Sequence, residues 1–424
     1  MIDIKKIVNN TEGVRKALLK RIPEDELDLG KIVTLYKEKQ EALKRYETLR
    51  AEQNSYNEKM AKLDKGSQAF KDLVQNLKSV SADVKKLEDE VKAYEDKLTV
   101  LIEVLPNIPD VDVVAGGKEN NEVIETFGEK PEKNFEVKDH VEIGEELGIF
   151  DFERAAKMGG AQMAMYRGDG ALLEWALIQF FIKEHLKDGY EMILPPHLLT
   201  ENSAYVAGQL PKFKEDVFWT TDGYCLLPTA ETALANYYKD EIVDESELPK
   251  KLFAYTPCYR KEAGSYRANE RGLMRMHQFN KVEMFQYTTD EASDLAFEEL
   301  VGKAKDLVEK LGLHYNLVKL AAGDCSAGMA RTYDVEVYLP GLDRYIEVSS
   351  CSNARDYQTR RGNMRFKPAD GGKPRLMHSL NASGLATSRL MVAVVETYQN
   401  SDGSITVPDV LRDFVGKDKI SKNS

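Results

Sequence analysis

The sequence predicts an α+β fold, in which an antiparallel β-sheet is flanked by helices and is preceded by a long antiparallel helical hairpin. Two observations support this prediction. Apolar residues recur every three or four positions across about 27–102, a spacing typical of long paired helices. Later segments alternate polar and apolar residues, and two of them, 251–255 and 279–287, flank one polar loop as antiparallel strands would.

The hairpin consists of two heptad seams separated by Gly66 and Ser67. Each helix should have roughly 35 residues and a length of about 50 Å at 1.5 Å per residue. Periodicity alone favours a coiled coil that dimerises the protein. The first seam is Ile32, Leu35, Lys39, Ala42, Tyr46, Leu49, Gln53, Tyr56, Met60 and Leu63, and the second is Phe70, Leu73, Leu77, Val80, Val84, Leu87, Val91, Tyr94, Leu98 and Leu101.

Composition indicates an ordinary globular protein of two or three domains, since the chain has 424 residues, 42% of them hydrophobic and 31% charged. The sequence contains no run of about 18 apolar residues, which is the length that a membrane-spanning helix needs. The first residues, MIDIKKIVNN, lack the apolar stretch of a secretory signal. The cysteines, Cys225, Cys258, Cys325 and Cys351, are far apart, which favours reduced thiols over a zinc site or a disulfide framework.

The net charge of −12 does not exclude a nucleic-acid partner, because binding depends on where the cations lie. Residues 31–102 contain 15 Lys and Arg against 13 Asp and Glu, a balance of +2 that leaves −14 for the rest of the chain.

Prolines divide the chain into its expected domains. Residues 1–105 form an N-terminal domain that begins with a short helical lead-in, 1–26, and Pro106 ends its last helix. Residues 106–135 are rich in Gly, Asn and Glu and are expected to be a linker. A second, larger domain is expected to occupy 136–424.

The stretch from Cys258 to Phe285, CYRKEAGSYRANERGLMRMHQFNKVEMF, organises the second half of the chain. Its arginines suit a bound polyanion, because guanidinium groups present planar forks of donors. A solvated hairpin tip whose charges do nothing is the alternative. Carboxylates and an aromatic ring in the same stretch favour a site for a phosphate, a base and a small zwitterion. The residues concerned are Arg260, Arg267, Arg271, Arg275, Glu262, Glu283 and Phe279.

YRKEAG, RGLMRMHQF and KVEMF resemble the second signature motif of class II aminoacyl-tRNA synthetases, about 251–287 here, in the form that seryl-tRNA synthetases carry. The resemblance extends over nearly the whole chain. It implies a class II antiparallel sheet with an N-terminal coiled-coil arm that lies along the long variable arm of tRNA. Lys59, Lys62, Lys65, Lys85 and Lys86 would then contact phosphates.

Residues 170–196 resemble motif 1, whose helix and strand form the interface of a two-fold homodimer. The helix is expected to end near Asp188-Gly189, and the strand at Pro195 or Pro196. Trp175 stands where the family usually has a basic residue. The apolar face of the helix consists of Leu172, Leu173, Ala176, Leu177, Phe180 and Phe181.

The segment LPTAE contains Thr229, Ala230 and Glu231, which could hold an ammonium group. A plain helix N-terminus capped by Thr229 is the alternative. The segment resembles the loop with which seryl-tRNA synthetases hold the α-amino group of serine.

After a helix expected over 290–312, TYDVEVYLP and YIEVSSCSN alternate as strands. Their acidic residues, Glu336 and Glu347, would be solvent-facing by default. By resemblance, Glu347 and Ser350 coordinate Mg²⁺ bound to ATP, an ion that prefers a few protein oxygens together with phosphate and water. Asn353 and the segment 358–361 also match the family.

HSLNASGLATSRLMVAVVETYQ resembles motif 3, about 376–399, whose arginine faces the ATP phosphates. Here that residue is Arg389, although an arginine at this place could also pair with an unrelated carboxylate. Gly384 permits close passage of the backbone. Ala382 and Ser388 replace glycines common in bacterial seryl enzymes.

The resemblance implies ATP-dependent ligation of L-serine to tRNA(Ser) through seryl-adenylate, and serylation of tRNA(Sec) as well, by a cytoplasmic homodimer that uses Mg²⁺. Arg260 and Arg389 would be the catalytic residues. The serine site would consist of Thr229, Ala230, Glu231, Arg260, Glu283, Asn381 and Ser383. The ATP site would consist of Arg260, Lys261, Glu262, Arg275, Phe279, Glu347, Val348, Ser349, Ser350 and Arg389.

Three other functions fit the sequence less well. A non-catalytic ATP- or amino-acid-binding regulator would be expected to lack Arg260, Glu347 or Arg389, and all three are present. A homologue that aminoacylates a carrier protein would lack the arm. A structural coiled-coil protein would not explain the 300 or so residues that follow it.

Overall fold

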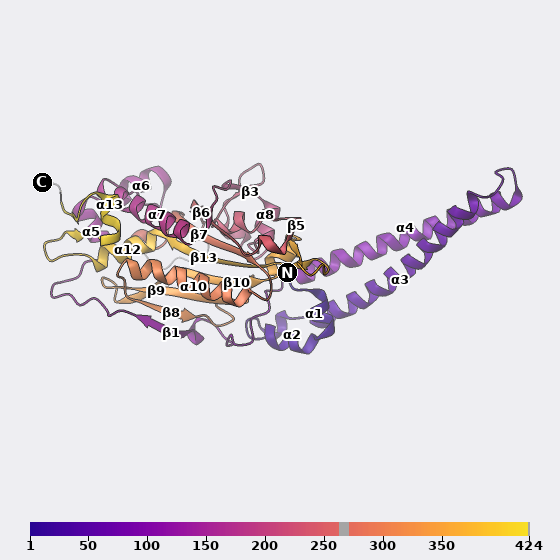
Figure 1. The fold of residues 1–424 in the computed structure, drawn as a ribbon, viewed down its shortest axis with the longest axis horizontal. Helices are drawn as coiled ribbons and strands as arrows, with labels where there is room; N and C mark the ends of the chain where they lie inside the picture. The colour runs from indigo at the N-terminus through magenta and orange to yellow at the C-terminus, as the bar shows by residue number, and fades with distance from the viewer. Residues whose placement is uncertain (263–270, 423–424) are drawn as a thin grey trace. The chain divides into compact units, whose positions relative to one another are not determined.

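The computed structural model describes residues 1–262 and 271–422, so Arg267 lies outside the described residues. The chain divides into two compact units, Ile2–Pro106 and Asn107–Ser424, and Figure 1 shows the elements of both. None of the helices in the described ranges combines the length and the apolar character that a membrane crossing requires.

The N-terminal unit is entirely helical. Two short helices, α1 (Ile4–Asn9) and α2 (Thr11–Leu18), precede two long ones, α3 (Leu29–Met60) and α4 (Gln68–Glu103). The side chains of Asp28 and Ser67 cap the long helices by accepting hydrogen bonds from the backbone amides of Lys31 and Phe70.

The two long helices form the predicted antiparallel hairpin. Cross-helix pairs join Lys39 to Glu95, Arg45 to Glu90 and Gln53 to Ser81, so residue numbers rise along one helix as they fall along the other. All ten positions of the second seam are buried or half-buried. In the first seam only Leu63, which lies past the end of α3, is exposed.

The second unit is built on an eight-stranded sheet with the order β1-β8-β9-β10-β13-β7-β6-β2. Its neighbours are antiparallel, except for β2 and β6, which are parallel. The strands are β1 (Glu122–Phe127), β2 (Glu191–Met192), β6 (Lys250–Tyr259), β7 (Gln278–Thr288), β8 (Tyr315–Lys319), β9 (Arg331–Leu339), β10 (Arg344–Arg355) and β13 (His378–Ala386).

Three helices share one apolar core with the sheet: α7 (Asp169–Lys187), α10 (Ser293–Lys310) and α12 (Thr387–Thr397). Helix α10 runs across β9, β10 and β13 (Figure 1). The predicted helices and strands of the three motifs are therefore present, and the α+β sheet with its flanking helices is confirmed. The strand predicted to end at Pro195 or Pro196 is shorter, because β2 ends at Met192.

Residues 106–135, for which composition predicts a linker, contain β1, which pairs with β8 at the edge of the sheet. Its side chains are mostly exposed on both faces of the strand. The sequence therefore has no strict alternation of apolar and polar residues from which the strand could be predicted.

Smaller elements complete the unit. β3 (Leu198–Thr200) pairs with β4 (Tyr224–Leu226), and β14 (Ile405–Thr406) pairs with β15 (Lys419–Ile420). In a three-stranded sheet, β11 (Arg365–Lys367) lies between β5 (Ile242–Asp244) and β12 (Arg375–Leu376). The helices are α5 (His140–Leu147), α6 (Phe152–Gly159), α8 (Glu201–Val206), α9 (Glu231–Leu234), α11 (Tyr357–Arg361) and α13 (Arg412–Val415).

Candidate active site

A cleft opens where β6, β7, β10 and β13 meet the start of α12. Alternation along β7 explains part of its lining: Phe279 and Lys281 face the cleft, whereas Val282 and Met284 face the apolar core. The cleft is lined by Arg260, Glu262, Met274, Arg275, Met276, Phe279, Lys281, Glu347, Val348, Ser383, Ala386, Ser388 and Arg389.

Two bulges add lining residues that strict alternation would not supply. The register of β10 against β9 shifts between Glu347 and Ser349, and Glu347 and the adjacent Val348 both line the cleft. The register of β13 against β7 shifts between Ser383 and Ala386, which also both line it. A bulge changes the direction of the side chains next to it and is frequent beside active sites.

Three arginines from different elements reach the cleft, and each contacts a protein acceptor. Arg275 Nε lies 2.9 Å from Glu262 Oε2. Arg389 Nη1 donates to the carbonyl oxygen of Glu347 at 2.9 Å and approaches its Oε2 at 3.3 Å. These contacts hold the guanidinium groups in place at the edge of the cleft, as recognition of phosphate requires.

Arg260 directly follows the end of β6 at Tyr259 and lines the cleft. Its Nε donates to the carbonyl oxygen of Pro228 at 3.2 Å, and its guanidinium carbon lies 5.1 Å from the centre of the Phe279 ring. Arg260 is therefore held between the LPTAE segment and the aromatic residue that the sequence assigns to adenine.

The predicted serine site forms the buried end of this region. Thr229, Glu231, Glu283 and Asn381 are all buried, and Asn381 Nδ2 donates to Glu283 Oε1 at 3.1 Å. The Thr229 hydroxyl accepts hydrogen bonds from the backbone amide of Glu231 at 3.2 Å and from Lys281 Nζ at 2.7 Å, and its role in holding an ammonium group stays a prediction.

Lys281 was not predicted as a site residue, yet it sits among the groups assigned to serine. Its Nζ donates to Thr229 Oγ1 at 2.7 Å and forms an ion pair with Glu283. Alternation from Phe279 through Lys281 to Glu283 is the signal that could have placed it on this face.

Burial, followed by the negative charge of Glu283, raises the pKa of Glu231 to about 7. The positive charges of Lys281 and Arg260 oppose that increase, and so does a hydrogen bond from Gln358. Gln358 Nε2 lies 2.7 Å from Glu231 Oε1, and Gln358 Oε1 in turn accepts from Ser379 Oγ. A ligand ammonium group at Glu231 would favour its ionised form.

Carboxylates also gather beside Glu347. Burial, and then the charge of Glu347, raises the pKa of the buried Asp334, whereas a hydrogen bond from Ser350 lowers it. Asp334 Oδ1 has no hydrogen-bond partner among the described residues. This donor set fits a divalent cation, which would offset the repulsion between the carboxylates. In the described ranges no group of three or more His, Cys, Asp and Glu residues is arranged to hold a metal by itself.

Some predicted ATP-site residues lie outside the cleft lining. Ser349 is buried and donates to the Ser383 carbonyl oxygen at 2.6 Å, Ser350 bonds to Asp334, and the Lys261 ammonium lies over the Phe218 ring. Their contact with nucleotide stays a prediction. Met274, Met276 and Ala386 line the cleft and were not predicted.

The structure also accounts for the unusual residues of motif 3. A Cβ on Gly384 would lie 2.4 Å from His185 Nε2, which confirms the close passage expected there. Ala382 is fully buried in the core and does not line the cleft, whereas Ser388 does.

The five lysines assigned to tRNA are all exposed on the helical hairpin. Lys59 lies near the end of α3, Lys62 and Lys65 lie in the turn, and Lys85 and Lys86 lie on α4. Exposure leaves their side chains accessible to a phosphate backbone.

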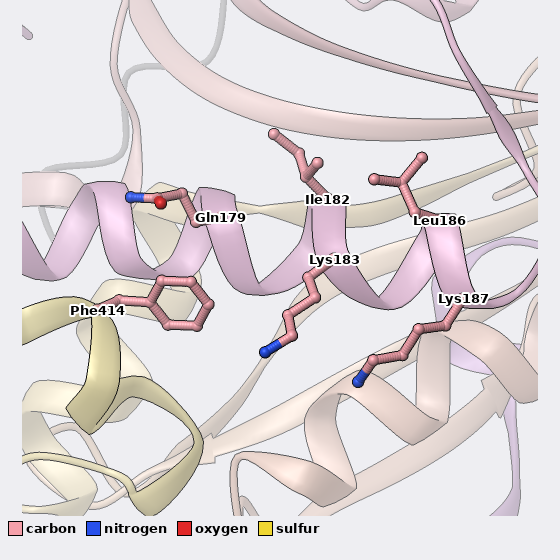
Figure 2. A pocket seen from close by; sticks show the side chains of 6 residues that line it. All are labelled: Gln179, Ile182, Lys183, Leu186, Lys187 and Phe414. Carbon is pink, nitrogen blue, oxygen red and sulfur yellow. The ribbon is translucent and has the colours of Figure 1, made fainter.

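Helix α7 presents a second, outward seam. Leu172, Trp175, Gln179, Ile182 and Leu186 step by three and four, and Trp175 is 52% exposed. Figure 2 shows Ile182 and Leu186 on one side of the helix and Lys183 and Lys187 on the other. A shallow groove here is lined by Gln179, Ile182, Lys183, Leu186, Lys187 and Phe414.

Two family models match the chain: the seryl-tRNA synthetase N-terminal domain over residues 1–109 and the tRNA synthetase class II core domain (G, H, P, S and T) over residues 215–398. Serine-tRNA ligase 2 of Clostridium acetobutylicum is 51% identical over 99% of this chain and 100% of that protein. Serine-tRNA ligase of Geobacter sulfurreducens is 42% identical over 98% and 99%.

Solved structures agree along the full length. Seryl-tRNA synthetase from Pyrococcus horikoshii, complexed with ATP, superposes with a TM-score of 0.92 at 32% identity, covering 100% of both chains. The cytoplasmic serine-tRNA ligase from Naegleria fowleri, in complex with AMP, gives 0.88 at 25% identity and covers 100% of this chain and 99% of that one. The chain belongs to the seryl-tRNA synthetases, a family of class II aminoacyl-tRNA synthetases also called serine-tRNA ligases.

Proposed function

We propose that this enzyme joins L-serine to tRNA(Ser) in two steps, with seryl-adenylate as the intermediate. The observation that carries the proposal is the cleft itself, which is lined by Arg260, Arg275 and Arg389 and by Lys281, whose ammonium group contacts the buried Thr229 and Glu283. Arginines that could bind a triphosphate therefore lie beside polar groups that could bind a small amino acid.

In the first step, a serine carboxylate oxygen attacks the α-phosphorus of ATP. The new O–P bond forms as the bond to pyrophosphate breaks, so seryl-adenylate and pyrophosphate account for all atoms. Positioning and charge neutralisation dominate such a substitution, and no protein nucleophile is required.

Arg260 is the residue proposed to bridge the serine carboxylate and the α-phosphate, because it already lies between Pro228 and Phe279. Its charge would offset the repulsion between the two anions. Phe279 would stack on adenine, Glu262 would accept from the adenine amino group, and Arg275 and Arg389 would hold the outer phosphates.

Glu347 and Ser350 are the proposed ligands of Mg²⁺ carried by ATP, and Asp334 lies beside them. When bound, the ion supplies positive charge to the phosphate oxygens. Arg389, which contacts Glu347 here, would turn toward the phosphates once that carboxylate has another partner.

Selection of serine would rest on Glu283 and Ser383 at its hydroxyl and on Thr229 and Glu231 at its ammonium group. A site built to hydrogen-bond a hydroxyl can reject the analogue without it by about 10⁴-fold, because its buried polar groups lose a partner. Alanine is therefore excluded by chemistry, whereas threonine must be excluded by size.

In the second step, the terminal ribose hydroxyl of tRNA takes the seryl group and releases AMP. The match to the seryl-tRNA synthetase N-terminal domain and the exposed lysines support a role for the hairpin in binding tRNA. We extend the proposal to tRNA(Sec) as a second acceptor. A cytoplasmic location is proposed, because none of the four cysteines, all in the described ranges, forms a disulfide.

A homodimer is proposed from the outward seam of α7. Exposed apolar residues at heptad spacing are typical of a helix that meets a partner, and a two-fold axis would pair the seam with its copy. Replacing Leu186, which is 53% exposed, with Glu should yield monomers in analytical ultracentrifugation. A monomeric wild-type protein at micromolar concentration would contradict the dimer.

Serine-dependent exchange of pyrophosphate into ATP tests the first step. All twenty amino acids should be screened, with and without purified tRNA, and serine should give the exchange. The absence of exchange with any amino acid would favour a non-catalytic regulator.

A further inference from the structure

Glu174 is a buried carboxyl that none of the proposed steps uses. It lies on α7 and is only 4% exposed. It reaches β7 from the side opposite the cleft, because it contacts Asn280 while the flanking Phe279 and Lys281 line the cleft.

One oxygen of this carboxyl joins three elements. Glu174 Oε1 accepts from Asn280 Nδ2 at 2.9 Å and from Thr387 Oγ1 at 2.5 Å. The Thr387 hydroxyl also lies 3.1 Å from the carbonyl oxygen of Asn280. Helix α7, strand β7 and the first residue of α12 are thus tied at one point.

Both partners of Glu174 stand next to residues that line the cleft. Asn280 lies between Phe279 and Lys281 on β7, and Thr387 is followed by Ser388 and Arg389 on α12. A shift of either partner would carry these side chains with it, and misplacement by about 1 Å can lower a rate by about 100-fold.

The surroundings of Glu174 are apolar or neutral. Burial raises its pKa to about 7, against the lowering effect of the hydrogen bonds from Thr387 and Asn280. The titratable groups that face it are Tyr166, which precedes α7, and Tyr255 on β6; burial and then Glu174 raise the pKa of each phenol. No cation of the described residues contributes to the pKa of Glu174.

The carboxyl can hold both donors in its neutral form. Protonation leaves Oε1 as a carbonyl acceptor and gives Oε2 a proton. Within the described residues, neither Glu174 Oε2 nor the Tyr166 hydroxyl has a hydrogen-bond partner. Glutamine has the same shape as the neutral acid and keeps the acceptor oxygen.

We propose that Glu174 is a positioning residue for adenylation, which fixes β7 and the start of α12 so that Phe279, Lys281 and Arg389 keep their separation. The inference deepens the proposed function and rests on it. A residue that merely stabilised the fold would change the unfolding temperature and leave kcat and KM unaltered.

The test compares four variants of the full-length protein in serine-dependent pyrophosphate exchange, with kcat and KM for ATP measured beside thermal unfolding. Glu174→Ala should lower kcat at least tenfold and raise KM for ATP, because both donors lose their acceptor. Glu174→Gln should restore kcat to within about threefold of the wild type, since the neutral isostere keeps the acceptor. Thr387→Val removes only a hydroxyl and should lower kcat severalfold, which keeps the test valid if the alanine variant fails to fold.

Glu184→Gln is the matched control, because Glu184 is a buried glutamate of the same helix that pairs with Lys187 and Lys310 instead of facing the cleft strands. It should lose stability without a change in kcat or KM. Should Glu174→Ala and Thr387→Val behave like this control, the positioning role is overturned. Failure of the wild type to exchange would instead overturn the proposed function.

A second readout is pH. The raised pKa of Glu174 favours the protonated form in the fold, so stability is lost as pH rises from about 4.5 to about 7 and is constant above. The unfolding temperature of the wild type should therefore fall relative to Glu174→Gln between pH 5 and pH 8. Glu231 also titrates near pH 7, but it is present in both proteins and cancels in the comparison. A constant difference between the two proteins would contradict a buried neutral Glu174.

Discussion

The cleft and the helical hairpin both depend on charged side chains, but they place them in opposite environments. In the cleft, Lys281 and Glu283 are paired and buried, so each charge has a fixed partner. On the hairpin, lysines such as Lys62 and Lys85 are exposed, where salt screens them and neighbours can replace them. Single changes should therefore cost much in the cleft and little on the hairpin.

The largest effect is expected for Arg260→Ala. Loss of a donor aimed at the reacting phosphate should cost about 3 kcal/mol or more in the transition state, which is over about 100-fold in exchange rate. Arg375→Ala is the control, because Arg375 pairs with Asp290 and Glu291 at the surface. If the exchange rate fell equally in both variants, the expectation that charges in the cleft matter more than charges at the surface would be wrong.

A smaller effect, in binding, is expected for Glu231→Gln. Serine KM should rise roughly 10- to 100-fold, because a charged hydrogen bond to the ammonium group is lost. In the wild type, serine KM should rise as pH falls below about 7, since protonation removes the charge of Glu231. Exchange kinetics from pH 6 to pH 8 measure both, and Glu201→Gln, at an exposed pair with Lys214, serves as control. If the serine KM of Glu231→Gln depends on pH as the wild-type KM does, a residue other than Glu231 is responsible for the titration.

On the hairpin, joint replacement of Lys59, Lys62 and Lys65 by Ala should raise KM for tRNA roughly tenfold and leave pyrophosphate exchange unchanged. The salt dependence of tRNA binding should fall by about one unit of slope per lysine. A variant with Lys71, Lys78 and Lys92 replaced has the same change of charge. If it weakens binding equally, the hairpin acts through net charge and not through the lysines at its tip.

The smallest effect is expected for Ser388→Gly, which restores a glycine common in the family. The Ser388 side chain lines the cleft, yet it is neither charged nor part of the proposed binding groups. KM for ATP should change by less than about threefold, with a stability loss of about 1 kcal/mol or less for glycine in a helix. A tenfold change in KM for ATP would show that this hydroxyl limits the pocket.

Periodicity predicted the parts of the molecule where burial is regular. The ten positions of the second heptad seam are all buried or half-buried, and alternation along β7 places Glu283 on the same face of the strand as Phe279, which lines the cleft. The order of the three motifs likewise matched the strands and helices that carry them.

The sequence failed where the structure departs from regular alternation. At the bulge after Glu347, Val348 lines the cleft as the resemblance implied, whereas Ser349, predicted for the same site, is buried and lies outside the lining; alternation does not mark the position of the bulge. The composition of 106–135 does not reveal strand β1, because an exposed edge strand requires no apolar face. Lys281 was missed because a lysine in a strand is expected to face solvent, whereas its contacts with Thr229 and Glu283 bury it.

The position of Lys281 in the proposed serine site has a consequence for how ligands would enter. Lys281 already contacts Thr229 and Glu283, so under the proposed function serine would compete with this internal ammonium group and would gain only the difference between two similar sets of bonds. A small molecule without a positive charge could not replace the ion pair between Lys281 and Glu283. The ligand-free site would therefore select a ligand first by its positive charge and only then by its shape.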